Sequence, residues 1–382
     1  MNGFCFQTCK TIVNQPGAVA TLADYCKKLG ATRPLIVTDQ GIVSAGLVDT
    51  ALTAISSDTP VYDKVVADPP TQIINDAVSF AQEHKADAII GLGGGSTMDT
   101  AKLVALLTQS KEKLTDIYGI DQTKGPRLPL ILIPTTSGTG SEVTPIAIVN
   151  KEDDTKVGIV SDYLIPDVAL LDAELTVGLP KFATACTAID AMVHAIEAFT
   201  GALRKNPYSD ILAKQALRLL SKNINAVIRN PEDIEARQQM LFGATLAGQA
   251  FANSPVGAVH ALAYPLGGQF HISHGLSNSL VLPGVLKFNS TKISYMYIDL
   301  AECVFAGNPI YAQRSNALQS FIDYFTELAI SCELPTRLSE VDIPEFTLSS
   351  LAEDAMQQER LLINNPVAVT YDDALEIYQD VY

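Results

Sequence analysis

The segment ADAIIGLGGGSTMDTAKLVALL, residues 86–107, decides the fold of the first half of this chain. It predicts a buried strand, a turn of three consecutive glycines and the start of a helix. Glycines let the backbone come close to a ligand, and the N–H groups of a helix's first turn favour an anion such as a pyrophosphate. The segment is therefore a candidate dinucleotide-binding turn. Its pattern Gly91-x-Gly93-x-x-Ser96 departs from the usual GxGxxG, so a tight turn without a ligand fits these residues about equally well.

Short β-branched runs alternate with helical patterns on both sides of this segment. Residues 34–38 and 129–134 predict further buried strands, and residues 73–84 predict a helix. Such alternation is typical of an α/β domain on a mainly parallel sheet. From residue 181 onward the periodicity is helical almost throughout. We therefore expect a dinucleotide-binding α/β domain over residues 1–180 and an all-α domain over residues 181–382.

The composition is typical of a globular enzyme. Of the 382 residues, 47% are hydrophobic and 18% are charged. The formal net charge of −16 would repel phosphate backbones and anionic lipids, so we expect neither nucleic acid nor a membrane as a partner. The six cysteines form no CxxC pattern and are too sparse for a disulfide-stapled domain. They indicate reduced thiols and a cytoplasmic protein.

A candidate metal site comes from two distant segments. In TACTAIDAMVHAIE, residues 184–197, Asp190 and His194 lie four apart on one face of a predicted helix. His260 and His274 follow in an apolar, glycine-rich stretch. One carboxylate and three imidazoles suit a divalent transition metal. A buried ion pair with core histidines is the alternative, but the chain has only five histidines, and these three occupy segments too apolar to need them for packing.

Four segments together closely resemble the iron-containing (group III) alcohol dehydrogenases: GGGSTMDTAK (93–102), PTTSGTGSE (134–142), AIDAMVHAIE (188–197) and HALAYPLGGQFHISHG (260–275). The resemblance covers essentially the whole chain in family order. It implies the dehydroquinate synthase-like fold, with an α/β dinucleotide-binding domain and an all-helical metal-binding domain. It also implies reversible oxidation of an alcohol with a nicotinamide cofactor, and a homodimer as the assembly.

The resemblance assigns site residues position by position. The metal ligands fall on Asp190, His194, His260 and His274. The cofactor contacts fall on the phosphate-loop residues, a threonine set, a lysine and two acidic residues, namely Gly94, Gly95, Ser96, Asp99, Thr135, Thr136, Thr139, Lys156 and Asp39. Asp39 also ends a predicted strand, where a carboxylate would bind a ribose and repel a 2′-phosphate, which favours NAD over NADP. From the residues alone, a turn at Asp39 is the stronger interpretation.

Two positions depart from the family pattern. Tyr264 stands where many members carry a histidine that assists proton transfer, and Asn365-Pro-Val stands where many carry Asn-Pro-Arg. Tyr264 and His271 are therefore candidates for moving the proton, although a packing or surface role is the simpler interpretation of His271. Phe251 and Val256 are candidates for an apolar substrate wall, with core packing as an equal alternative.

Together these features predict an NAD-dependent alcohol dehydrogenase with a divalent metal. The resemblance favours Fe²⁺, whereas the ligand types also admit Zn²⁺. The expected reaction interconverts a small primary alcohol or diol and its aldehyde, because no Lys/Arg group accompanies the metal motifs to bind a phosphorylated substrate. The alternatives are a sugar-phosphate lyase or dehydrogenase of the dehydroquinate synthase or glycerol dehydrogenase type, and a silent binding protein that keeps the fold.

Overall fold

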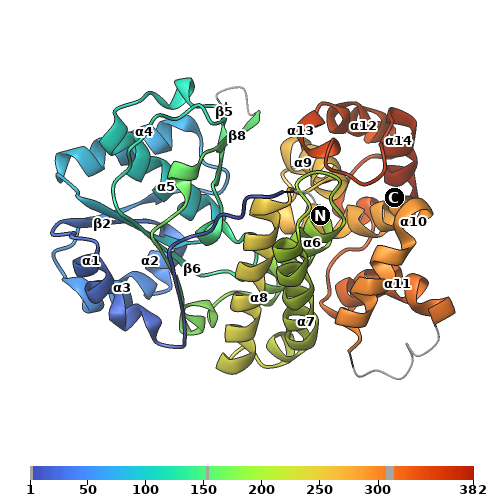
Figure 1. The fold of residues 1–382 in the computed structure, drawn as a ribbon, viewed down its shortest axis with the longest axis horizontal. Helices are drawn as coiled ribbons and strands as arrows, with labels where there is room; N and C mark the ends of the chain where they lie inside the picture. The colour runs from blue at the N-terminus through green and yellow to red at the C-terminus, as the bar shows by residue number, and fades with distance from the viewer. Residues whose placement is uncertain (1–2, 152–154, 307–313) are drawn as a thin grey trace. The chain divides into compact units, whose positions relative to one another are not determined.

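The computed structural model describes residues 3–151, 155–306 and 314–382 (Figure 1). These residues form two compact units. One comprises Thr8–Leu179, and the other comprises Pro180–Tyr382 together with the N-terminal segment Met1–Gln7, of which residues 3–7 are described. The expected boundary after residue 180 therefore differs from the observed division mainly in residues 3–7, which belong to the helical unit. Gln7 belongs with the helical unit because its backbone N–H and C=O pair with the Asn253 side chain at 2.7 and 2.8 Å.

The first unit is built on a six-stranded parallel sheet with the order β1-β9-β6-β4-β2-β3. Its strands are β1 (Thr11–Asn14), β2 (Pro34–Asp39), β3 (Val61–Val65), β4 (Ala88–Gly93), β6 (Leu130–Pro134) and β9 (Val168–Leu171). A smaller mixed sheet contains β5 (Gly119–Ile120), β8 (Lys156–Val160) and β7 (Ile146–Asn150). The predicted α/β class is confirmed.

Helices cover both faces of the parallel sheet (Figure 1). They are α1 (Leu22–Lys28), α2 (Gln40–Ser44), α3 (Leu47–Ile55), α4 (Thr71–Glu83) and α5 (Gly95–Ser110). Ile36 and Ile90 belong to a core shared with α1 and α3, whereas their neighbours Leu35 and Ile89 belong to a core shared with α4 and α5. Because successive strand residues point to opposite faces, continuous apolar runs such as that of β4 fill both cores at once.

The turn between β4 and α5 depends on glycine. A Cβ on Gly91 would lie 2.7 Å from Ala101 Cβ, so only glycine lets α5 pack this closely on its strand. Gly93 has φ +156°, and a Cβ there would lie 2.8 Å from Thr97 Cβ. The helix begins at Gly95 directly after this turn. The glycine run therefore sets where the N-terminus of α5 lies.

The second unit is helical throughout its described part, which confirms the predicted all-α class. Its helices are α6 (Lys181–Thr200), α7 (Pro207–Arg229), α8 (Ile234–Asn253), α9 (Ala258–Phe270), α10 (His274–Val304), α11 (Arg314–Ser331), α12 (Leu348–Met356), α13 (Glu359–Leu362) and α14 (Tyr371–Asp380). Helix α6 is long and apolar enough to cross a membrane by composition, but 83% of its apolar window is buried within the structure. That environment is typical of a core helix.

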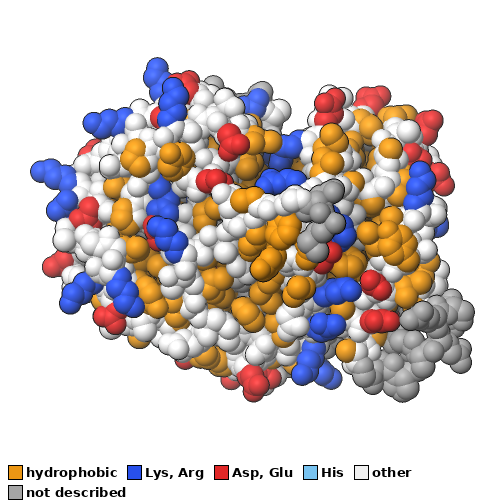
Figure 2. Space-filling view, viewed as in Figure 1, with side chains coloured by type: hydrophobic (Ala, Val, Ile, Leu, Met, Phe, Trp, Pro, Cys, Tyr) orange, Lys and Arg blue, Asp and Glu red, His pale blue; other side chains and the backbone are white. Residues whose placement is uncertain are grey.

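Charged side chains are distributed over the surface. On the face shown in Figure 2, lysine and arginine side chains are spread over the α/β unit. Acidic residues outnumber basic ones by 42 to 26 in the whole chain.

Candidate functional site

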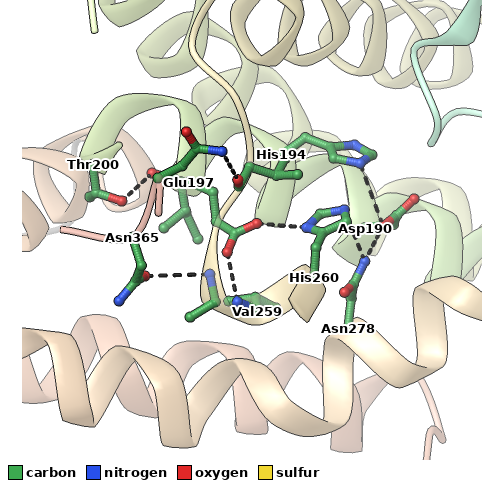
Figure 3. A network of polar contacts seen from close by, with 12 residues as sticks. Asp190, His194, Glu197, Thr200, Val259, His260, Asn278 and Asn365 are labelled. Atoms are coloured by element: carbon green, nitrogen blue, oxygen red, sulfur yellow. Dashed lines mark hydrogen bonds and ion pairs between the residues drawn. The ribbon is translucent and has the colours of Figure 1, made fainter. Parts of the chain in front are cut away.

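Four side chains converge in the core of the helical unit, and we call them the ligand cluster: Asp190, His194, His260 and His274. One potential ligand atom from each lies within 4.8 Å of every other. Figure 3 shows three of the four, Asp190, His194 and His260. Asp190 Oδ1 is 3.8 Å from His194 Nε2 and 3.5 Å from His274 Nε2. The structure therefore brings together the four residues that the sequence proposed as metal ligands.

Three helices supply these side chains. Asp190 and His194 lie one turn apart in the middle of α6, His260 lies in the first turn of α9, and His274 is the first residue of α10. The start of α10 approaches α6 closely, because a Cβ on Gly275 would lie 2.4 Å from the Cys186 carbonyl oxygen. Glycine directly after His274 is thus required for that histidine to reach α6.

The ligand cluster is largely shielded from solvent. Asp190, His194 and His260 are buried, whereas the His274 side chain is 37% exposed. The His194 ring stacks on His260 with centroids 4.9 Å apart and on Phe251 with centroids 4.4 Å apart. The exposed side of His274 is therefore the open side of the cluster within this unit.

Asn278 lies at the centre of the cluster. Its Nδ2 is 2.6 Å from Asp190 Oδ1, 3.2 Å from His274 Nε2 and 3.4 Å from His260 Nε2. Burial on its own raises the pKa of Asp190, but interactions with the three imidazoles and with the Asn278 amide bring that pKa below its usual value. The carboxylate form is therefore favoured in the core.

The donor set fits a divalent transition metal. Imidazole nitrogen and carboxylate oxygen both bind such ions, and four protein ligands are a normal number. The Asn278 amide nitrogen contacts three of the donor atoms at once, so the lone pairs of those atoms converge on one small region. A cation requires that arrangement. Asp190, His194, His260 and His274 are the residues that would hold it.

Four further predicted residues differ in their relation to the cluster. Phe251 stacks on His194, and the Tyr264 ring centroid is 5.9 Å from that of His274. Val256 is buried upstream of α9, where its carbonyl accepts a hydrogen bond from Asn364. His271 is exposed at the C-terminal cap of α9. It does not belong to the ligand cluster, which is the group of converging ligand atoms found among the described residues.

Sequence reasoning missed two partners of the ligands, Asn278 and Glu197. The Glu197 carboxylate binds His260 Nδ1 at 2.6 Å and the Val259 N–H at 2.7 Å (Figure 3). Both missed residues stand at helical spacings from a ligand, Glu197 three after His194 and Asn278 four after His274. That spacing was an available signal.

In the α/β unit, the glycine turn and the threonine-rich loop after β6 are in contact. A Cβ on Gly95 would lie 2.7 Å from Thr139 Cγ2, and one on Gly94 would lie 3.7 Å from Thr136 Cγ2. The Thr135 N–H donates to the Gly93 carbonyl at 3.1 Å. The Thr136 hydroxyl is buried without a hydrogen-bond partner. A cradle of glycine backbone beside an unsatisfied hydroxyl fits the polar part of a dinucleotide.

The other predicted cofactor residues already have protein partners. Asp39 Oδ1 caps α2 through the Ile42 N–H, and its Oδ2 accepts from the Thr97 hydroxyl at 3.0 Å. Asp99 accepts from the Ser141 hydroxyl at 2.6 Å and from the Ile148 N–H at 2.9 Å. Asp39 thus combines the turn-opening role with a position beside the first turn of α5, and Asp99 ties α5 to β7.

Lys156 and Ser96 share a partner that the sequence did not indicate. Lys156 Nζ is 2.7 Å from Asp68 Oδ1, and the Asp68 N–H donates to Ser96 Oγ at 3.2 Å. Asp68 therefore holds the lysine near the glycine turn. Lys156, Ser96 and the threonines are the residues that would surround a bound dinucleotide.

Comparisons with known proteins agree with this architecture. Residues 9–173 match the family described as "Iron-containing alcohol dehydrogenase", and residues 184–382 match "Fe-containing alcohol dehydrogenase family, C-terminal". Long-chain-alcohol dehydrogenase 1 of Geobacillus thermodenitrificans is 40% identical over 372 residues, which is 96% of this chain and 93% of that protein.

Solved structures give the same result. A 1,3-propanediol oxidoreductase superposes with a TM-score of 0.95 at 28% identity, covering 100% of both chains. The sulfoacetaldehyde reductase from Bifidobacterium kashiwanohense, in complex with NAD⁺, superposes with a TM-score of 0.88 at 25% identity, covering 100% of this chain and 99% of that one.

Proposed function

The chain belongs to the iron-containing alcohol dehydrogenase family, and on that premise we propose that it is an NAD-dependent enzyme that interconverts a small primary alcohol or diol and its aldehyde at a bound Fe²⁺. The observation that carries this proposal is the convergence of four donor atoms within 4.8 Å in the helical unit. The glycine cradle of the other unit supports a dinucleotide.

In the forward direction the alcohol loses a hydride to NAD⁺ and its hydroxyl proton to the protein or to water, giving the aldehyde and NADH. Asp190, His194, His260 and His274 would hold a divalent ion, which would act as a Lewis acid and lower the pKa of the substrate hydroxyl. The ligand cluster would hold that ion at one place, and Phe251 covers one face of the His194 ring. Phe251 and Val256 would form the apolar wall beside the substrate.

The proton needs a carrier near the open side of the cluster. Tyr264 is half-buried and its ring lies beside that of His274, whereas His271 is exposed outside the group of ligand atoms. We therefore favour Tyr264, whose hydroxyl can both accept and donate a proton in a relay with water. His271 becomes the less favoured carrier.

NAD is preferred to NADP in this proposal because Asp39 lies at the C-terminal end of β2, beside the first turn of α5. A carboxylate there would bind a ribose hydroxyl and repel a 2′-phosphate. Iron is preferred to zinc because of the family to which the chain belongs; the donor types suit both ions. The small-substrate class rests on similarity to a 1,3-propanediol oxidoreductase. The Geobacillus relative is named for long-chain alcohols, so the test includes long alcohols.

The test is a cofactor-linked screen with metal-free enzyme that has been reloaded separately with Fe²⁺ and Zn²⁺. Each form is assayed with NAD⁺ or NADP⁺ and short alcohols, long alcohols, 1,3-propanediol and, in reverse, aldehydes including sulfoacetaldehyde. We expect NADH from short primary alcohols or diols, with the iron form more active. Substrate consumption without net NADH would indicate a lyase and overturn the proposal, as would full activity of the metal-free enzyme.

We further propose that the enzyme is a cytoplasmic homodimer. The sparse cysteines support a reducing compartment, and the dimer rests on family membership alone. Light scattering of the purified protein tests the dimer, since a monomer at micromolar concentration would contradict it. Fractionation of the source cells tests the compartment.

A further inference from the structure

Glu197 is a buried carboxylate that the proposed reaction does not use. It lies on α6 with Asp190 and His194, at positions i, i+4 and i+7, so all three side chains leave the same face of the helix. Its Oε2 is 2.6 Å from His260 Nδ1, and its Oε1 accepts the Val259 N–H at 2.7 Å. A single helix thus provides two potential ligands and the partner of a third.

The contact at Nδ1 determines which nitrogen of His260 faces the cluster. An ionised carboxylate oxygen can only accept, so a neutral imidazole in this contact carries its proton on Nδ1 and its lone pair on Nε2. Asn278 gives independent support, because its Nδ2 lies 3.4 Å from His260 Nε2, where an amide donor needs an acceptor. Figure 3 shows Glu197 and Asn278 on either side of the His260 ring. Both contacts favour the tautomer in which Nε2 can bind a metal.

The same carboxylate also fixes the helix that carries His260. Gly257 provides no side-chain cap at the start of α9. Glu197 accepts from Val259 there, and Asn365 Oδ1 accepts the Ala258 N–H at 3.4 Å. These contacts orient the first turn of α9, in which His260 is the third residue.

The charges of the two buried carboxylates support a role for Glu197 in binding a cation. Glu197 is only 6% exposed, and Asp190 is only 2% exposed. Two carboxylates together match a divalent ion, and a buried charge is costly unless it is compensated. A carboxylate behind a ligating histidine also fixes its tautomer and increases its basicity in metal sites generally.

We propose that Glu197 is a positioning residue for metal binding, which holds His260 in the Nδ1–H tautomer and thereby makes Nε2 available before any metal arrives. The inference rests on the proposed metal site. It predicts a property of the metal-free protein, namely the proton position on one imidazole. A role in helix capping alone would not determine that position.

The first test measures this tautomer in metal-free protein with ¹⁵N-labelled histidine. Long-range ¹H–¹⁵N NMR correlations distinguish the two neutral tautomers, and the chain has only five histidines to assign. We expect the wild type to show His260 protonated at Nδ1. A wild-type His260 protonated at Nε2 would overturn the inference without any variant.

The second test compares Glu197→Gln with Asn365→Ala in metal binding. The glutamine oxygen can accept from Val259 or from His260 but not from both, so His260 loses its defined tautomer. We expect Zn²⁺ and Co²⁺ affinity, measured by competition with a chelator, to fall about 10- to 100-fold, and the visible spectrum of the Co²⁺ form to change. Asn365→Ala removes another acceptor at the start of α9, together with the hydrogen bonds of Asn365 to Asn289 and Val367. Asn365 has no hydrogen bond to His260, so the metal affinity of this variant should stay close to that of the wild type.

The outcomes separate this inference from the proposed function. If the wild type binds metal and Glu197→Gln binds it equally well, the positioning role is wrong while the metal site stands. If Asn365→Ala weakens binding as much as Glu197→Gln, the effect is one of helix stability, and the inference is also wrong. A wild type that binds no metal contradicts the proposed function itself, whereas the tautomer measurement still tests the contact with Glu197. If Glu197→Gln does not fold, the wild-type tautomer decides.

Discussion

Asp190 determines the electrostatics of the ligand cluster. It is buried, yet its pKa lies below the usual value because the three imidazoles and the Asn278 amide favour its charged form. A charge held in an apolar core is stable only with such partners. The carboxylate is therefore prepared to meet a cation, and Asn278 occupies the centre of the cluster as its hydrogen-bond donor.

The glycine turn allows a sharp comparison of two neighbouring residues. A Cβ at Gly95 would lie 2.7 Å from Thr139 Cγ2, whereas one at Gly94 would lie no closer than 3.7 Å to Thr136. We expect Gly95→Ala to lower the free energy of unfolding by about 1–3 kcal/mol and Gly94→Ala to leave it nearly unchanged. Both variants should bind NADH more weakly, because the added methyl group enters the space proposed for the cofactor. Denaturation and NADH fluorescence titrations measure the two effects; equal stability of the two variants would contradict the steric account.

The position of His274 depends on the close contact between helices α10 and α6. In Gly275→Ala the new Cβ would lie 2.4 Å from the Cys186 carbonyl oxygen, so α10 must shift. We expect stability to fall by about 1–3 kcal/mol and metal binding to weaken. The matched control is Gly268→Ala in α9, where nothing lies within 4 Å of the new Cβ. If Gly275→Ala bound metal as the control does, the close approach would not matter for the site.

Asp167 directly precedes β9, which lies between β1 and β6 in the parallel sheet. Its carboxylate binds Arg127 at 2.6 Å, Lys10 at 3.0 Å and the Leu130 N–H at 3.1 Å. Burial raises its pKa, but the hydrogen bond and charge of Arg127, the hydrogen bond from Lys10 and the Leu130 N–H together lower it below the usual value. A pKa that is lower in the folded state than in the unfolded chain contributes stability above the unfolded pKa, and this stability is lost as pH falls through the folded pKa.

We therefore expect Asp167→Asn to lower the free energy of unfolding by about 1–3 kcal/mol at neutral pH. The difference from the wild type should shrink as pH falls below about 4, where aspartate in the unfolded chain becomes protonated. Denaturant titrations at several pH values measure it. A stability difference that grew toward acid pH would show that the pKa of Asp167 is not lower in the folded state than in the unfolded chain.

Periodic and compositional signals predicted the elements well. The apolar runs of β2, β4 and β6 are buried as expected, and the helical spacing in α6 placed Asp190 and His194 on one face. The partners of the ligands were harder to predict. Asn365 reaches the start of α9 from 107 positions away, and no local pattern encodes such a contact. Glu197 stood inside the predicted helix but had no identifiable partner until α9 was placed.

The two proposed binding sites belong to different units. All four residues of the ligand cluster belong to the helical unit, and the glycine turn belongs to the α/β unit. The change to helical periodicity from residue 181 onward predicted a division into two domains. The assignment of residues 3–7 to the helical unit was not predictable, because it depends on the tertiary pairing of Gln7 with Asn253.

This division predicts that metal removal acts on one unit. A ligand stabilises only the region whose folding creates its site. Chelation should therefore increase hydrogen exchange in α6, in the start of α9 and in the start of α10, with little change in β2, β4 and β6. Adding NADH to the metal-free enzyme should protect the turn after β4 instead. Mass spectrometry of exchanged peptides measures both effects. A uniform loss of protection over both units after chelation would contradict the expectation that metal removal affects the helical unit alone.

The most direct measurement is X-ray absorption spectroscopy of the protein loaded with one equivalent of Fe²⁺ or Zn²⁺. The account predicts one tightly bound ion per chain with nitrogen and oxygen neighbours at about 2.0–2.2 Å and scattering from three imidazole rings. The His260→Ala variant should lose one ring from that pattern and bind the ion more weakly. A site with sulfur neighbours, fewer than three imidazoles in the wild type, or an unchanged pattern in the variant would contradict the assignment of Asp190, His194, His260 and His274.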